Sequence, residues 1–117
     1  MYTVYLADDE QLIREGLAET IPWESLRMRL VGTAEDGRHA LRGIREHKPD
    51  IVLTDIRMPY LDGLELIGKI REVHPSCRVV IISGHGEFTY AQSAIQLGVS
   101  DFILNPVDVT SLCRTLG

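Results

Sequence analysis

The chain has 117 residues, with 12 Lys and Arg against 17 Asp and Glu, and its formal net charge is −5. This length fits one domain, and a composition that is 44% hydrophobic and 25% charged is globular, which excludes a disordered tail or a fibrous repeat. The basic residues are scattered singly, whereas a nucleic-acid reader needs clustered Lys and Arg to hold phosphates. The acidic balance therefore favours a cationic partner or a metal ion.

The first apolar run, at residues 4–7, leads directly into acidic residues, without the basic segment and long apolar stretch of a signal peptide. No run approaches the ~18 apolar residues that a membrane helix needs. Two cysteines, Cys77 and Cys113, are too few for a disulfide framework, and the spacing of His74 and Cys77 is most simply incidental. We therefore expect a soluble domain in a reducing, cytoplasmic setting.

Short apolar runs alternate with helical patterns along the whole chain. Four runs are apolar on both faces of a period-two pattern, which is typical of parallel strands covered by helices on both sides. They lie at 4–7, 51–54, 79–82 and 102–104. A fifth run, at 29–34, is less apolar and is expected at an edge of the sheet. Apolar residues at the helical period follow these runs, at 12–21, 40–44, 64–70, 88–95 and 109–116.

The order is therefore strand then helix, five times over. Right-handed crossovers and doubly covered strands predict an α/β fold, a doubly wound, flavodoxin-like sheet of five parallel strands in the order 2-1-3-4-5. Prolines before two strands and Gly98 after a helical pattern agree with these boundaries. The last helical pattern stops at Gly117 soon after it begins, so we interpret residues 1–117 as one domain of a longer protein.

Three acids follow two strands that are neighbours in this order. Asp8 and Asp9 end the first strand and Asp55 ends the third, at the edge where ligands of such sheets bind. Three close carboxylates repel one another unless a cation lies among them, and oxygen ligands that leave room for water and phosphate suit Mg²⁺. Asp55 could also act as a nucleophile toward phosphorus. Taken singly, Asp9 could instead cap the first helix and Asp55 could begin a turn.

Four segments, in order, resemble the receiver (CheY-like) domain of two-component response regulators. They are Leu-Ala-Asp-Asp-Glu at 6–10, the stretch from Asp to Gly at 55–63, Ile-Ser-Gly at 82–84, and the stretch from Asp to Asp at 101–108. The resemblance covers nearly the whole chain, and the segments fall at matching strand ends. It implies the N-terminal receiver domain of a longer regulator.

The resemblance also implies roles for the acids. Asp55 would accept a phosphoryl group from the histidine of a sensor histidine kinase, while Asp9, Asp55 and the backbone carbonyl of Arg57 would ligate Mg²⁺. Asp8 would act mostly through a water on the metal. Such a domain catalyses its own phosphorylation and dephosphorylation but is not a conventional enzyme.

A receiver domain changes its surface when it is phosphorylated, and the resemblance names the residues that would respond. Ser83 would move toward the phosphoryl group, and Phe102 would turn inward. The change would be read on the face formed by the fourth helix, the fifth strand and the fifth helix, where a second copy or an output domain could pair.

The segments at 21–23 and 86–91 are similar to the subgroup whose output is an AraC-type DNA-binding domain. This would make the whole protein a transcription regulator whose own receiver domain does not touch DNA. Trp23 has an equally good structural interpretation, as an apolar plug under the loop after the first helix.

Asn105 departs from the family pattern. Receiver domains carry a lysine directly before the proline that is Pro106 here, and that lysine pairs with the phosphoryl group. Three carboxylates and one Mg²⁺ leave a charge of −1, which a lysine would cancel and an asparagine cannot. A lost preorganised donor typically costs roughly 2.7–4 kcal/mol of transition-state stabilisation in other enzymes. We expect slow phosphorylation or poor coupling to output; the resemblance also implies a cis bond before Pro106.

Two alternatives remain open. Because Asn105 replaces the lysine, the domain could be a phosphorylation-independent interaction module that keeps the fold. A stand-alone Mg²⁺-dependent phosphatase is less favoured, since Arg57 occupies the position two residues after Asp55 where a second acid would be needed.

Overall fold

A computed structural model of the protein describes residues 1–55, 63–83 and 101–104, and for 63, 64, 83 and 101–104 it describes the backbone only. The elements are β1 (Tyr2–Ala7), α1 (Gln11–Thr20), β2 (Met28–Ala34), α2 (Gly37–His47), β3 (Ile51–Asp55), α3 (Gly63–Val73), β4 (Arg78–Ser83) and β5 (Asp101–Leu104). The helical patterns at 88–95 and 109–116 lie outside the described residues. Within the described residues, no helix is both long and apolar enough to span a membrane.

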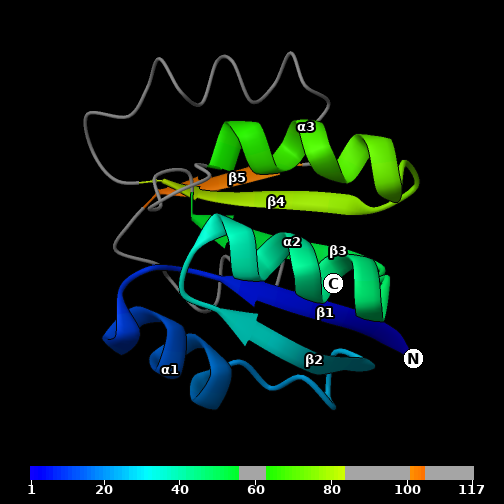
Figure 1. Ribbon diagram of the computed structural model, residues 1–117. Helices are drawn as coiled ribbons and strands as arrows, with labels where there is room; N and C mark the ends of the chain where they lie inside the picture. The colour runs from blue at the N-terminus through cyan, green and yellow to red at the C-terminus, as the bar shows by residue number, and fades with distance from the viewer. Residues whose placement is uncertain (56–62, 84–100, 105–117) are drawn as a thin grey trace.

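The strands form one parallel sheet in the order β2-β1-β3-β4-β5 (Figure 1). This order confirms the prediction of a doubly wound α/β sheet, and β2 lies at an edge, as its lower apolar content indicated. The five arrows run in one direction, so the carboxyl ends of the strands meet at one edge of the sheet. Any side chains that follow β1 and β3 are therefore gathered at that edge.

Alternate residues of the central strands face opposite layers. On one face, Val4 and Leu6 of β1 pack with Leu53 of β3 and with residues of α1. On the other face, Tyr5 and Val52 pack with residues of α2 and α3. Figure 1 shows the same division, with α1 on one side of the sheet and α2 and α3 on the other. Burial on both faces explains why these strands read as continuous apolar runs.

Tyr5 is packed between an edge strand and a helix. Its ring is buried, and its hydroxyl donates to the carbonyl oxygen of Thr33 at 3.3 Å. A Cβ at Gly32 of β2 would lie 2.7 Å from Cε2 of this ring, and a Cβ at Gly43 of α2 would meet the hydroxyl end of the same ring. Glycine at both positions is what lets the ring fill this space.

The loop after α1 is closed by Trp23. Its Nε1–H donates to the carbonyl oxygen of Ala18 at 3.0 Å, and its ring packs against the core layer that contains Val4 and Leu6. The structure therefore supports the interpretation of Trp23 as a plug under this loop.

The amino ends of the strands are tied together by Asp50, the residue before β3. Its Oδ2 accepts hydrogen bonds from the backbone N–H of Thr3 at 2.8 Å and from the Thr3 hydroxyl at 3.2 Å. Its carbonyl oxygen accepts the N–H of Arg78, the first residue of β4. One residue thus links β1, β3 and β4 at the end of the sheet opposite the acidic residues.

Candidate functional site

The register of β1 and β3 places the predicted acids side by side. Ala7 pairs with Thr54, so Asp8 and Asp55 come next at the same edge of the sheet. Oxygen atoms of Asp8, Asp9 and Asp55 all lie within 4.8 Å of one another. Asp8 and Asp55 are buried and Asp9 is exposed, so the cluster is reached from solvent on the side of Asp9.

Asp8 is held in a fixed orientation. Its N–H donates to the carbonyl oxygen of Ala34 at 3.0 Å, which extends the β1–β2 pairing by one residue. Its Oδ1 accepts the N–H of Glu10 at 2.9 Å. Its Oδ2 is buried and has no hydrogen-bond partner among the described residues. The pKa of Asp8 is raised to about 6, because burial and the nearby Asp9 carboxylate together outweigh the hydrogen bond from the N–H of Glu10.

The cluster fits a hard divalent cation. A buried carboxylate oxygen without a partner is costly unless a cation or donor reaches it. The neighbouring ligand groups, from Asp9 and Asp55, are carboxylates too, and Mg²⁺ prefers such oxygen ligands while keeping several waters in its coordination shell. The residues present therefore match the Mg²⁺ that the sequence led us to expect.

A second group of ligand-type side chains lies after β2. Atoms of Glu35, Asp36 and His39 are within 4.8 Å of one another. Asp36 is the N-cap of α2: its Oδ1 accepts the N–H of His39 at 2.9 Å, and its Oδ2 lies 2.7 Å from Nδ1 of the same residue. Burial opposes ionisation of Asp36, but the hydrogen bonds from His39 outweigh it and its pKa lies below the usual value.

Both Asp36 oxygens are therefore already partnered, and this second group is explained as a helix cap. Sequence reasoning missed it, although an Asp three residues before a polar residue at the start of a helical pattern is a recognised N-terminal signal.

The start of α1 tests the alternative that Asp9 caps this helix. The N-cap residue there is Glu10, with no side-chain cap bond, so the alternative that Asp9 caps α1 is wrong.

Arg14 was also missed. It lies on α1, and its Nη1 donates to the backbone carbonyl oxygen of Asp8 at 2.8 Å. Nothing in the chain around position 14 indicates that this side chain turns back toward the end of β1, because the contact depends on how α1 is placed on the sheet.

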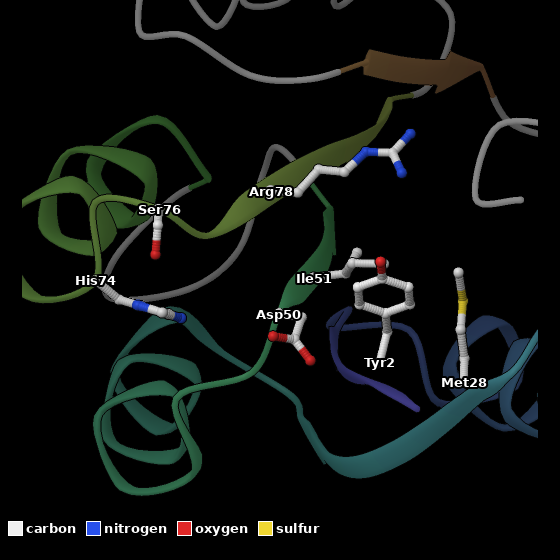
Figure 2. A pocket seen from close by; sticks show the side chains of 7 residues that line it. All are labelled: Tyr2, Met28, Asp50, Ile51, His74, Ser76 and Arg78. Atoms are coloured by element: carbon white, nitrogen blue, oxygen red, sulfur yellow. The ribbon is translucent and has the colours of Figure 1, made fainter.

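A pocket of about 410 Å³ lies at the opposite end of the sheet (Figure 2). Its lining includes the first residues of four strands, and the full set is Tyr2, Met28, Asp50, Ile51, His74, Ser76 and Arg78. Because Asp8 and Asp55 lie at the other ends of β1 and β3, this pocket is separate from the acidic cluster.

His74 lines this pocket, and it and Cys77 have separate surroundings. Nε2 of His74 lies 2.8 Å from the carbonyl oxygen of Pro49, while Cys77 is buried in the core. Burial raises the pKa of the Cys77 thiol to about 11. The structure thus agrees with the interpretation that their spacing is incidental.

Two further predicted residues are placed by the backbone alone. Ser83 is the last residue of β4 and pairs with Leu104, and Phe102 lies in β5 opposite Ile81. The expectations for the carbonyl of Arg57, for Asn105 and for a cis bond before Pro106 concern positions outside the described residues.

This fold, with acids gathered at the carboxyl ends of β1 and β3, defines a signalling receiver. The family model described as the response regulator receiver domain matches residues 4–116, and the chain belongs to that family.

Known relatives agree with this assignment. The chain is 44% identical over 116 residues to the uncharacterized transcriptional regulatory protein YesN of Bacillus subtilis, covering 99% of this chain and 32% of that protein. It is 43% identical over 117 residues to the transcriptional regulatory protein HptR of Staphylococcus aureus, covering 100% of this chain and 46% of that protein. The chain therefore spans between about a third and a half of the length of these curated relatives.

Solved structures show the same fold. The REC domain of AraT, a response regulator from Geobacillus stearothermophilus, matches with a TM-score of 0.94 and 43% identity over 98% of this chain and 89% of that one. A two component transcriptional regulator AraC from Clostridium phytofermentans matches with a TM-score of 0.90 and 32% identity over 99% of this chain and 90% of that one.

Proposed function

We propose that this receiver domain is a phospho-accepting switch, in which Asp55 takes a phosphoryl group from a sensor histidine kinase at a Mg²⁺ site. One observation carries the proposal. Asp8, Asp9 and Asp55 converge, and the buried Oδ2 of Asp8 has no partner among the described residues. The domain catalyses only its own phosphorylation and dephosphorylation, in the cytoplasm.

The acids divide the work by position. Asp55 is the last residue of the central strand β3, so it lies at the carboxyl edge of the sheet and its backbone is held in the strand. One of its oxygens forms a bond to phosphorus while the bond from phosphorus to the histidine nitrogen breaks. Asp9, Asp55 and the carbonyl of Arg57 would hold Mg²⁺, and Asp8 would act mostly through a water on the metal. When bound, Mg²⁺ offsets the carboxylate charge and that of the incoming phosphoryl oxygens.

The output of the switch is transcription. The relatives named as transcriptional regulators are about two to three times as long as this chain, which supports an additional output domain in the whole protein. The likeness to the two component transcriptional regulator AraC of Clostridium phytofermentans supports an AraC-type DNA-binding output. Ser83 and Phe102 would carry the phosphorylation signal to the face that includes β5, through which two copies or an output domain pair.

Asn105 supports a second candidate function. Without the lysine, the incoming phosphoryl oxygens meet a site that is more negative by one charge, and a neutral amide does not offset it. A domain that binds its partners without being phosphorylated would tolerate this change.

Intact mass separates the two candidates. The protein, Asp55→Ala and Asn105→Lys are incubated with Mg²⁺ and acetyl phosphate, and the added mass is measured over time. We expect one phosphoryl group on the protein, none on Asp55→Ala and faster uptake by Asn105→Lys. Uptake by Asn105→Lys alone would favour the interaction module, and uptake by Asp55→Ala would rule out Asp55 as the acceptor.

A further inference from the structure

We propose that Arg14 is a positioning residue for the cation site: its guanidinium fixes the peptide group of Asp8 and so sets the direction of the Asp8 and Asp9 side chains. The inference rests on the proposed Mg²⁺ site and adds a residue that does not touch the cation. Three observations lead to it.

First, Arg14 connects the body of α1 to the end of β1. Its backbone N–H donates to the carbonyl oxygen of Glu10 at 2.9 Å, as a helical residue should, while its side chain turns back to the Asp8 carbonyl oxygen at 2.8 Å. Between these two anchored carbonyl groups, of Asp8 and of the N-cap residue Glu10, lies only Asp9. The short segment that carries one exposed ligand, Asp9, is therefore held at both ends.

Second, the hydrogen bond from Arg14 is one of three that hold Asp8 in place. The N–H of Asp8 is bonded to β2, its Oδ1 to the N–H of Glu10, and its carbonyl oxygen to Arg14. Each bond comes from a different place in the fold. They leave Oδ2 as the atom without a partner among the described residues, which is the arrangement a ligand oxygen needs.

Third, α1 has no side-chain cap of its own, and besides Arg14 its start is held to Asp8 by the N–H of Glu10. Its N-cap residue makes no side-chain hydrogen bond, and its first turn contains no acid. The carbonyl of buried Asp8 would lose its partner if Arg14 were removed, and a buried carbonyl without a partner drives the loop to rearrange. The loop that would move carries Asp9.

A purely electrostatic role predicts the opposite result. The guanidinium also borders a groove of about 230 Å³ lined by Arg14, Thr33, Ala34, Glu35 and His39, so it is a cation between two acidic groups. A fixed positive charge beside a cation site repels the cation. At pH 8, above the pKa of Asp8, neutralising Arg14 would make Mg²⁺ bind more tightly if charge alone mattered, whereas loss of positioning makes it bind more weakly. The sign of the change therefore separates the two roles.

The test is isothermal titration with MgCl₂ of the protein and of three variants, with amide shifts of residues 8–10 followed by NMR. Arg14→Gln is expected to weaken Mg²⁺ binding about 10-fold, as loss of supporting contacts does in other metal sites. Arg29→Gln removes the same charge from an exposed position near the amino end of β2, paired with Thr3, and should leave the affinity unchanged. Arg14→Lys keeps the charge but loses the planar fork, so its affinity should fall between the two.

Equal or tighter Mg²⁺ binding by folded Arg14→Gln would overturn the proposal. Circular dichroism and urea unfolding establish whether each variant is folded. If Arg14→Gln does not fold, Arg14→Lys decides: weaker binding than the unaltered protein supports positioning, and equal binding refutes it. If the unaltered protein binds no Mg²⁺, the cation site of the proposed function fails, and the role of Arg14 fails with it.

Discussion

The carboxyl group of Asp8 links the stability of the domain to pH. Its pKa rises from 3.8 to about 6 on folding because it is buried, so the folded state holds this proton more tightly than the unfolded chain does. The resulting stabilisation is present in full below about pH 4 and is lost as the pH rises through about 6. Above that pH, the cation-free domain carries an ionised carboxylate whose Oδ2 has no hydrogen-bond partner within the described part of the chain.

Replacing Asp8 with Asn should therefore stabilise the cation-free domain at high pH. In chelator at pH 8, we expect Asp8→Asn to raise the free energy of unfolding by up to roughly 3 kcal/mol, the equivalent of its shift in pKa. At pH 4 the two proteins should be nearly equal. Urea unfolding at both pH values measures this, with Glu19→Gln, an exposed position near the far end of α1, as the control. A gain of equal size at both pH values would contradict the assignment of the effect to ionisation.

At the scale of elements, α2 and β2 are held at a set distance by the ring of Tyr5. A Cβ at Gly32 or at Gly43 would meet the ring, and the hydroxyl of the ring is bonded to Thr33. The ring therefore occupies the space that a side chain at either glycine would need. By contrast, a Cβ at Gly68 of α3 would meet nothing within 4 Å.

Replacing Gly43 or Gly68 with alanine should change the free energy of unfolding in opposite directions. Gly43→Ala is expected to lower the free energy of unfolding by about 1–3 kcal/mol, because the added methyl group overpacks the Tyr5 ring. Gly68→Ala should raise it by about 0.5–1 kcal/mol, since alanine is the better helix former. Urea midpoints at constant m-value measure both. Equal stabilisation by the two changes would mean that the Tyr5 ring moves aside at no cost.

The sequence was informative about elements for a physical reason. Strands buried on both faces leave apolar runs, and helices covering one face leave a 3.6-residue period, so the order of elements, the parallel sheet and the convergence of Asp8, Asp9 and Asp55 could be predicted. The contact from Arg14 and the position of Tyr5 between two glycines could not. Each depends on how a helix is seated against the sheet, which no local pattern records.

Across the whole molecule, the acidic cluster lies at one end of the sheet and the hydrogen bonds that tie the strands together lie at the other. Asp8 and Asp55 lie at the carboxyl ends, while Asp50 ties β1, β3 and β4 together at the amino ends. A strand of five residues, such as β3, separates the two ends by roughly 17 Å.

Changes at the two ends should therefore add. Asp50→Ala is expected to lower the free energy of unfolding by about 1–2 kcal/mol through the loss of its hydrogen bonds to Thr3, without changing Mg²⁺ affinity. In the double variant with Asp8→Asn, the two effects on stability should sum to within about 0.5 kcal/mol. Denaturant unfolding and Mg²⁺ titration of all four proteins complete this cycle. A larger coupling would show that the two ends communicate through the sheet.

The position of Trp23 has an optical consequence. It is the one tryptophan of the chain, and it is partly buried under the loop after α1, with its ring nitrogen bonded to Ala18. Fluorescence excited selectively in tryptophan therefore comes from Trp23 alone, whose ring packs against the core layer that includes β1. Its emission should shift to longer wavelength when that layer opens to water. One fluorescence trace would then follow the unfolding of the α1 side of the sheet in every variant named above.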